Sequence, residues 1–130
     1  MTDDDRAARG RAAYASQFRL REEEAVAELE RVIGARMASE AIQAAGGAWV
    51  DDVLSLRDRS LVVVAALAAQ GGVDERLRGH IRWALDHGVT AEQLEAAITL
   101  LAVYVGYPRA SVAMEVVRSV VAAESDAVEP

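Results

Sequence analysis

The sequence contains no cysteine, and this absence removes several kinds of chemistry. Disulfide bonds, thiol nucleophiles, thiolate metal sites and Cys-x-x-Cys redox pairs are all excluded. The acidic N-terminus has no apolar segment behind it, so no signal peptide is visible. The longest apolar run has nine residues, from Leu61 to Ala69. A membrane-spanning helix needs about 20. We therefore expect a cytoplasmic protein with no membrane partner.

Aromatic residues are also scarce, with two Trp, three Tyr and one Phe, although 52% of the 130 residues are hydrophobic. The core must therefore consist of Ala, Val, Leu and Ile, a composition that suits closely packed helices. The length predicts a single domain over residues 1–130, with frayed ends at 1–5 and 124–130. A net charge of −7 repels phosphate backbones, so we expect no nucleic-acid partner.

Apolar residues recur with helical spacing, and no segment alternates in the way a half-buried strand does. The sequence predicts an all-α fold of about six helices, in which the second is broken or bent at Gly34. Gly46-Gly47 and Gly71-Gly72 are interpreted as turn pairs, with a loop at 46–54. The predicted helical ranges are 5–17, 21–34 with a short continuation at 36–45, 55–70, 75–87, 90–105 and 108–123.

Several predicted helix ends have a local capping signal. Ser55 and Asp74 are predicted N-caps, and Thr90 with Gln93 forms the pattern of a capping box. Gly88 fits the C′ position after the helix that Asp74 begins. The helix after Ser55 is apolar on all sides in its middle, so we expect it to be fully buried.

The two histidines are the first candidates for chemistry, and both lie on the predicted helix 75–87. His80 and His87 are about 20° apart around the axis but about 10 Å apart along it, too far to share one metal ion, so no metal site is expected. His80 borders the apolar face. It is either a core-edge histidine with a polar partner or a general acid or base in a helix-lined pocket. His87 is in the last turn, where a cationic, capping role is expected.

Basic and amphipathic side chains supply candidates for ligand binding. Guanidinium groups bind carboxylates with two parallel hydrogen bonds, although most surface arginines pair with Asp or Glu instead. Arg57 and Arg59 are the strongest candidates because they adjoin the most apolar segment. Trp83 and Tyr104 are candidates for ligand contact or for packing, and Tyr104 precedes a tight Gly-x-Pro corner. The other residues considered are Trp49, Arg76, Arg78, Arg82 and Arg109.

Three blocks of the chain resemble one known family in order and spacing. Residues 55–61 (SLRDRSL) resemble an L-x-x-R-x-R-S-L motif, and residues 80–94 resemble H-x-x-x-A-L-x-x-G-x-T-x-E-E-L. Residues 104–113 resemble a Y-x-G-x-P-x-A-x-x-A corner. Together they resemble the carboxymuconolactone decarboxylase family. Two positions depart from the family pattern, since Ala96 and Leu100 stand where it has a Glu and a His.

The resemblance implies an alkylhydroperoxidase D-like helical fold and homo-oligomers, trimers or hexamers. It also implies cofactor-free decarboxylation of a small carboxylated lactone in aromatic-compound catabolism. His80 matches the family's functional histidine, and Arg57 and Arg59 would bind the substrate carboxylates. The peroxidase branch has cysteines where this chain has Val73 and Arg76, so thiol peroxidase activity is excluded. The alternative is a non-catalytic small-ligand-binding or assembly protein on the same scaffold.

Overall fold

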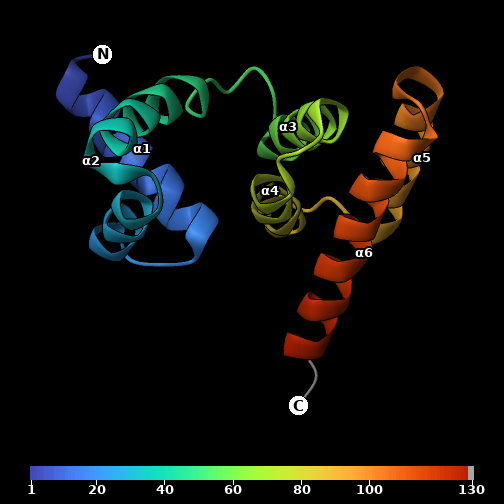
Figure 1. The fold of residues 1–130 in the computed structure, drawn as a ribbon. Coiled ribbons are helices and arrows are strands. Elements are labelled where there is room, and N and C mark those ends of the chain that lie inside the picture. The colour runs from blue at the N-terminus through green and yellow to red at the C-terminus, as the bar shows by residue number, and fades with distance from the viewer. Residues whose placement is uncertain (129–130) are drawn as a thin grey trace. The chain divides into compact units, whose positions relative to one another are not determined.

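The structure, a computed structural model, describes residues 1–128. In this range the chain forms six α-helices and no strand, which confirms the predicted all-α fold (Figure 1). No helix among residues 1–128 is both long and apolar enough to cross a membrane. The helices are α1 (Asp3–Phe18), α2 (Glu22–Ala48), α3 (Leu56–Gln70), α4 (Asp74–Asp86), α5 (Ala91–Val105) and α6 (Tyr107–Val128).

The helices form two compact units, an N-terminal unit (Met1–Val53) and a C-terminal unit (Leu54–Pro130), and each is described by itself. Regular structure reaches further toward both termini than the sequence predicts. Thr2 caps α1 through a reciprocal capping box with Asp5, so α1 begins at Asp3. At the other end, α6 continues to Val128, and positions 129–130 lie outside the described residues.

In the N-terminal unit, α1 and α2 pack against each other through glycines. A Cβ atom on Gly10 would lie 1.9 Å from the carbonyl oxygen of Ile42, and one on Gly46 would lie 1.8 Å from that of Arg6. Only glycine allows two helix backbones to approach so closely. The prediction that Gly46-Gly47 ends a helix and begins a loop is therefore wrong, because α2 runs through both residues to Ala48.

The predicted break at Gly34 is confirmed. Gly34 has φ 81° and ψ 158° inside α2, a conformation that an L-residue with a side chain rarely adopts. The kink divides α2 into two helical segments, and the unit's small apolar core contains Leu29 from the first and Ala38 and Ile42 from the second.

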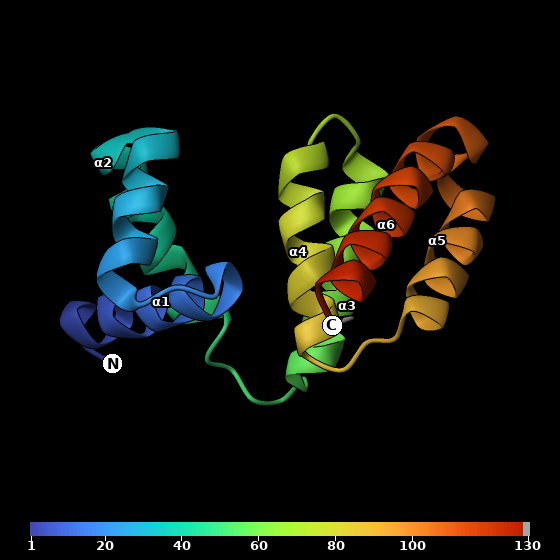
Figure 2. The same cartoon turned by 90° about the horizontal axis from the view of Figure 1, so that it is seen from below.

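In the C-terminal unit, four helices surround an aliphatic core. Figure 2 shows α3 beside α4 and α5 beside α6, and α6 also packs on α4. The core has little aromatic content, as the composition predicted, and its largest fully buried members are Val64, Ile81, Val89, Leu94, Ile98 and Val117. Each such side chain contributes about 1.5–3 kcal/mol by leaving water.

The prediction that the helix after Ser55 is buried on all sides is wrong for this chain. Val64 and Ala68 of α3 are buried, but Val62 is 59% exposed. The physical reason is that α4, α5 and α6 cover only part of the α3 surface. An apolar stripe of α3 thus remains uncovered.

Most of the predicted caps are confirmed. The Ser55 hydroxyl accepts from the Asp58 N–H at 3.0 Å, and Thr90 and Gln93 form a capping box. Gly88 has φ 94°, and its N–H donates to the Leu85 carbonyl, which closes α4. The expected Asp74 cap is wrong, because Val73 holds the N-cap position and Asp74 is the first helical residue. The turn at Gly71-Gly72 is confirmed, with φ values of 71° and 73°.

Candidate functional site: the histidine face of α4

His80, Trp83 and His87 form a row along α4. The ring centroids of His80 and Trp83 are 6.1 Å apart, and those of Trp83 and His87 are 4.7 Å apart. The spacings of three and four residues place successive rings on one helix face. Trp83 is only 4% exposed, so this indole packs firmly between the two imidazoles.

His80 is half-buried, and its Nδ1 atom is shielded from solvent. Burial lowers the pKa of this imidazole below its ordinary value near 6.5, because the charged form loses hydration. His80 is therefore neutral at neutral pH in the protein without a ligand. Both interpretations of His80, as a core-edge residue and as an acid–base group, remain compatible with this environment.

His87 joins α4 to α3 through a contact that the sequence analysis missed. Its Nδ1 atom lies 2.7 Å from the hydroxyl oxygen of Ser60, which is 1% exposed. The pair is 27 residues apart in the chain, beyond any local pattern. One signal was present: Ser60 precedes buried Val64 and Ala68 at intervals of four residues, so it belongs to the inward face of α3.

The predicted place of His87 at the C-terminal cap of α4 is confirmed, and its surroundings act against the cationic form that the helix dipole would favour. Burial is the main cause that lowers the pKa of His87, and the nearby positive charge of Arg59 lowers it further. The negative charge of Asp86 acts in the opposite direction. The net effect is a pKa of His87 below its ordinary value, with burial as the largest cause.

The two candidate arginines flank this junction at the start of α3. Nη1 of Arg57 lies 3.3 Å from a carboxylate oxygen of Asp58, an exposed pair of small energetic value. Nε of Arg59 donates to the Leu54 carbonyl at 2.9 Å, which anchors the segment before α3. The structure therefore brings Arg59, Ser60 and His87 together.

Tyr104 belongs to the other end of the C-terminal unit. The start of α3 and the end of α4 lie at one end, whereas the end of α5 lies at the opposite end, as does the α3–α4 turn (Figure 2). A helix of the length of α3 spans about 22 Å. Tyr104 is 78% exposed, and Ala96 and Leu100 are also exposed on α5. Within one chain, Tyr104 and the arginines of α3 do not share a site.

The remaining residues considered from sequence are dispersed. Trp49 follows α2 in the N-terminal unit, and Arg76 is exposed in the first turn of α4. Arg78 donates to the Ser119 hydroxyl at 3.0 Å, while Arg82 is half-buried. Arg109 donates to the Ala69 carbonyl at 2.8 Å. Within residues 1–128, no three His, Asp or Glu side chains are grouped so that they could hold a metal ion.

Comparison with known proteins identifies the family. Residues 36–119 match the model of the carboxymuconolactone decarboxylase family, and this range includes α3, α4, α5 and the histidine row. The chain belongs to this family. The match confirms the resemblance that the three sequence blocks indicated.

Two curated proteins are similar to parts of this chain. A 4-carboxymuconolactone decarboxylase from Acinetobacter baylyi is 38% identical over 75 residues, which is 58% of this chain and 55% of that protein. Peroxisomal protein 2 from Schizosaccharomyces pombe is 45% identical over 47 residues, 36% of this chain and 22% of that protein. The chain thus spans about half or less of the length of these relatives. No solved structure matches it significantly.

Proposed function

We propose that this protein is a cofactor-free lyase that decarboxylates a small carboxylated lactone or a related acid. The main support is the family membership together with the similarity to a protein named 4-carboxymuconolactone decarboxylase. His80 is the proposed proton donor, because it is a shielded imidazole on the helix that carries the family's second sequence block. Arg57 and Arg59 are the proposed carboxylate-binding groups, and Trp83 packs beside His80.

The proposed chemistry moves one electron pair and one proton. The bond between the carboxylate carbon and the ring breaks, carbon dioxide leaves, and the electron pair stays on the lactone as an enolate. An acid then delivers a proton to carbon. Guanidinium groups would stabilise the negative charge of the substrate and of the enolate.

A neutral histidine can fill the acid role once the substrate is bound. Burial lowers the pKa of His80 in the protein without ligand. An anionic substrate beside the imidazole raises the pKa again, because an opposite charge favours the protonated form. Substrate binding would therefore bring the proton that the reaction uses, and water is excluded from the Nδ1 side of the ring.

We also propose that the active form is a homo-oligomer, a trimer or a hexamer. Val103, Tyr104 and Tyr107 are 77%, 78% and 80% exposed around the α5–α6 corner. Large apolar groups gathered on one surface are typical of an interface. In an oligomer, Tyr104 could approach a site of a neighbouring subunit, whereas within one chain it is remote from Arg57 and Arg59.

The test is a direct assay of 4-carboxymuconolactone decarboxylation with purified protein. We expect His80→Gln to lower kcat by about 100-fold or more, since general acid catalysis typically contributes at least that much. Arg57→Gln and Arg59→Gln should mainly raise KM. Arg118→Gln, an exposed arginine on α6 that pairs with Glu95, is the control. Full activity of His80→Gln would contradict the mechanism, and an inactive wild type would contradict the substrate.

One observation favours the second candidate, a non-catalytic small-ligand-binding or assembly protein. Both proposed carboxylate-binding arginines already have partners within α3 or just before it, Asp58 for Arg57 and the Leu54 carbonyl for Arg59. Thermal-shift measurements with small carboxylic acids distinguish the two functions. Ligand-dependent stabilisation without turnover of any acid would support the second candidate.

A further inference from the structure

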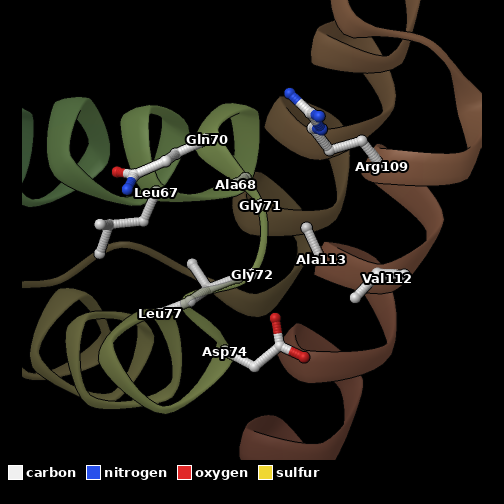
Figure 3. A pocket seen from close by; sticks show the side chains of 10 residues that line it. All are labelled: Leu67, Ala68, Gln70, Gly71, Gly72, Asp74, Leu77, Arg109, Val112 and Ala113. Carbon is white, nitrogen blue, oxygen red and sulfur yellow. The ribbon is translucent and has the colours of Figure 1, made fainter.

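A cavity of about 320 Å³ lies in the C-terminal unit, away from the junction of Ser60 and His87. It is bounded by the end of α3, the Gly71-Gly72 turn, the start of α4 and the first half of α6 (Figure 3). Its volume falls at the lower end of the range of small-molecule sites, about 300–1,000 Å³. Nothing in the proposed decarboxylation uses this cavity.

The cavity wall combines apolar side chains with polar groups of opposite charge that come from different helices. Leu67, Leu77, Val112 and Ala113 supply the apolar part of the lining. Arg109 enters from α6, and Asp74 enters from the first turn of α4 (Figure 3). A wall of this mixed kind offers contacts to both the apolar body and the polar ends of a small organic molecule.

Arg109 is held in place by its backbone surroundings. Its Nη1 donates to the Ala69 carbonyl at 2.8 Å, at the end of α3. The side chain also passes Gly71, where a Cβ atom would lie 3.1 Å from Nε of Arg109. One hydrogen bond occupies one of the five N–H donors of a guanidinium, so further donors remain for an anion. This arrangement fixes the orientation of the forked guanidinium group, which can bind a carboxylate through two parallel hydrogen bonds.

Asp74 provides a complementary charge but does not neutralise Arg109. The described ion pairs of the unit do not join these two side chains, although both line the cavity. A carboxylate at Asp74 accepts hydrogen bonds from an ammonium or hydroxyl group. A molecule with an acid group at one end and a hydrogen-bond donor at the other would therefore contact both side chains and place its apolar body between them.

We propose that this cavity binds a small dipolar acid. Its carboxylate lies on the Arg109 guanidinium, its ammonium or hydroxyl group lies on Asp74, and its apolar body covers Val112 and Ala113. Because the ligand contacts α3, α4 and α6, its binding stabilises the C-terminal unit. The site is separate from His80 and does not depend on the proposed lyase activity.

The test is a titration of the ¹⁵N-labelled full chain with 6-aminohexanoate, followed by amide chemical shifts. Gly71 and Gly72 line the cavity and are direct reporters, whereas Gly88 closes the opposite end of α4 and is the reference. We expect saturable shifts at Gly71 and Gly72 and no comparable change at Gly88. Hexanoate, which lacks the ammonium group, and 6-aminohexanamide, which lacks the carboxylate, should each bind more weakly.

Three variants locate the binding groups. Arg109→Gln should weaken 6-aminohexanoate binding about tenfold or more, because a charge-assisted pair is lost. Val112→Trp fills the cavity from a partly exposed position and should prevent saturable binding while leaving the charges intact. Arg118→Gln removes an exposed charge from the same helix outside the cavity and should bind like the wild type.

The proposal is overturned by any of three results. These are no saturable shift at Gly71 and Gly72, equal affinity in Arg109→Gln and the wild type, or larger shifts at Gly88 than in the Gly71-Gly72 turn. Circular dichroism of each variant confirms that the helices are intact. His80→Gln should retain full 6-aminohexanoate binding, so failure of the decarboxylase proposal and failure of this one give different results.

Discussion

The hydroxyl oxygen of Ser60 lies 2.7 Å from Nδ1 of His87, and this contact connects the first turns of α3 with the C-terminal end of α4. Ser60 is fully shielded from water, so its hydroxyl depends on the imidazole for a partner there. Loss of one member of such a pair leaves the polar group of the other without this contact, which costs free energy where that group is shielded from water. The contact also holds the ring of His87 beside Trp83.

Removal of the Ser60 hydroxyl should destabilise the C-terminal unit. We expect Ser60→Ala to lower the free energy of unfolding by about 1–3 kcal/mol, because the contact between the buried hydroxyl group and Nδ1 of His87 is lost. Urea denaturation followed by circular dichroism measures the change. Ser119→Ala, which removes an exposed hydroxyl from α6, should cost less than about 0.5 kcal/mol. Equal effects of the two substitutions would contradict a special role for the buried pair.

Stability should decrease as the pH falls below about 6.5, partly because of His80. Burial lowers the pKa of His80 in the folded protein, so the unfolded chain takes up a proton at a higher pH than the folded one. Above the pKa that His80 has in the unfolded chain, the imidazole is neutral in both states and does not reduce the free energy of unfolding. His80→Gln should therefore lose less stability than the wild type between pH 7.5 and pH 5. Identical pH dependence in urea titrations would show that His80 titrates normally.

Substitution by alanine should have different effects on stability at Gly46 and at Gly47. Gly46→Ala places a methyl group against the Arg6 carbonyl oxygen in the α1 backbone, which cannot move without separating the helices. We expect a loss of about 2–4 kcal/mol. A Cβ atom on Gly47 meets only the end of the flexible Arg6 side chain, at 2.8 Å. Gly47→Ala should thus be neutral or stabilising by up to about 1 kcal/mol, since alanine favours the helix.

Charge on the exposed α5 surface should prevent the proposed oligomer. Val103→Glu places a carboxylate at a position that is 77% exposed in the single chain, so the fold should tolerate it. We expect light scattering with size-exclusion chromatography to show a smaller species than the wild type. Ala122→Glu, at an exposed position further along α6, is the matched control. A wild-type monomer at micromolar concentration would contradict the oligomer proposal.

Features with local causes could be predicted from the sequence. The caps at Ser55, Thr90 and Gly88 each depend on residues within five positions in the chain, and all three are present in the structure. Asp74 shows the limit of this approach, since a good capping residue one position inside the helix gives the same local pattern. The helix break at Gly34 was predictable because glycine readily adopts a positive φ.

Features that depend on distant partners could not be predicted. Gly46 in α2 is required by the carbonyl oxygen of Arg6, which belongs to another helix. Ser60 and His87 meet only after α3 and α4 pack together. The exposure of Val62 reflects which α3 surface the neighbouring helices leave uncovered, and no periodicity within α3 encodes that. The histidine row was predictable because helix geometry alone aligns residues 80, 83 and 87.

The kink at Gly34 has a practical consequence for anyone who expresses part of this chain. The family match begins at Arg36, two residues beyond the kink, so trimming to the matched region keeps the second segment of α2 and discards α1. That segment carries Ala38, Ile42 and Gly46, which are buried in the N-terminal unit. A fragment cut at position 36 would present this apolar stripe to water and tend to aggregate. Truncation limits are better set by helix packing than by the start of detectable similarity.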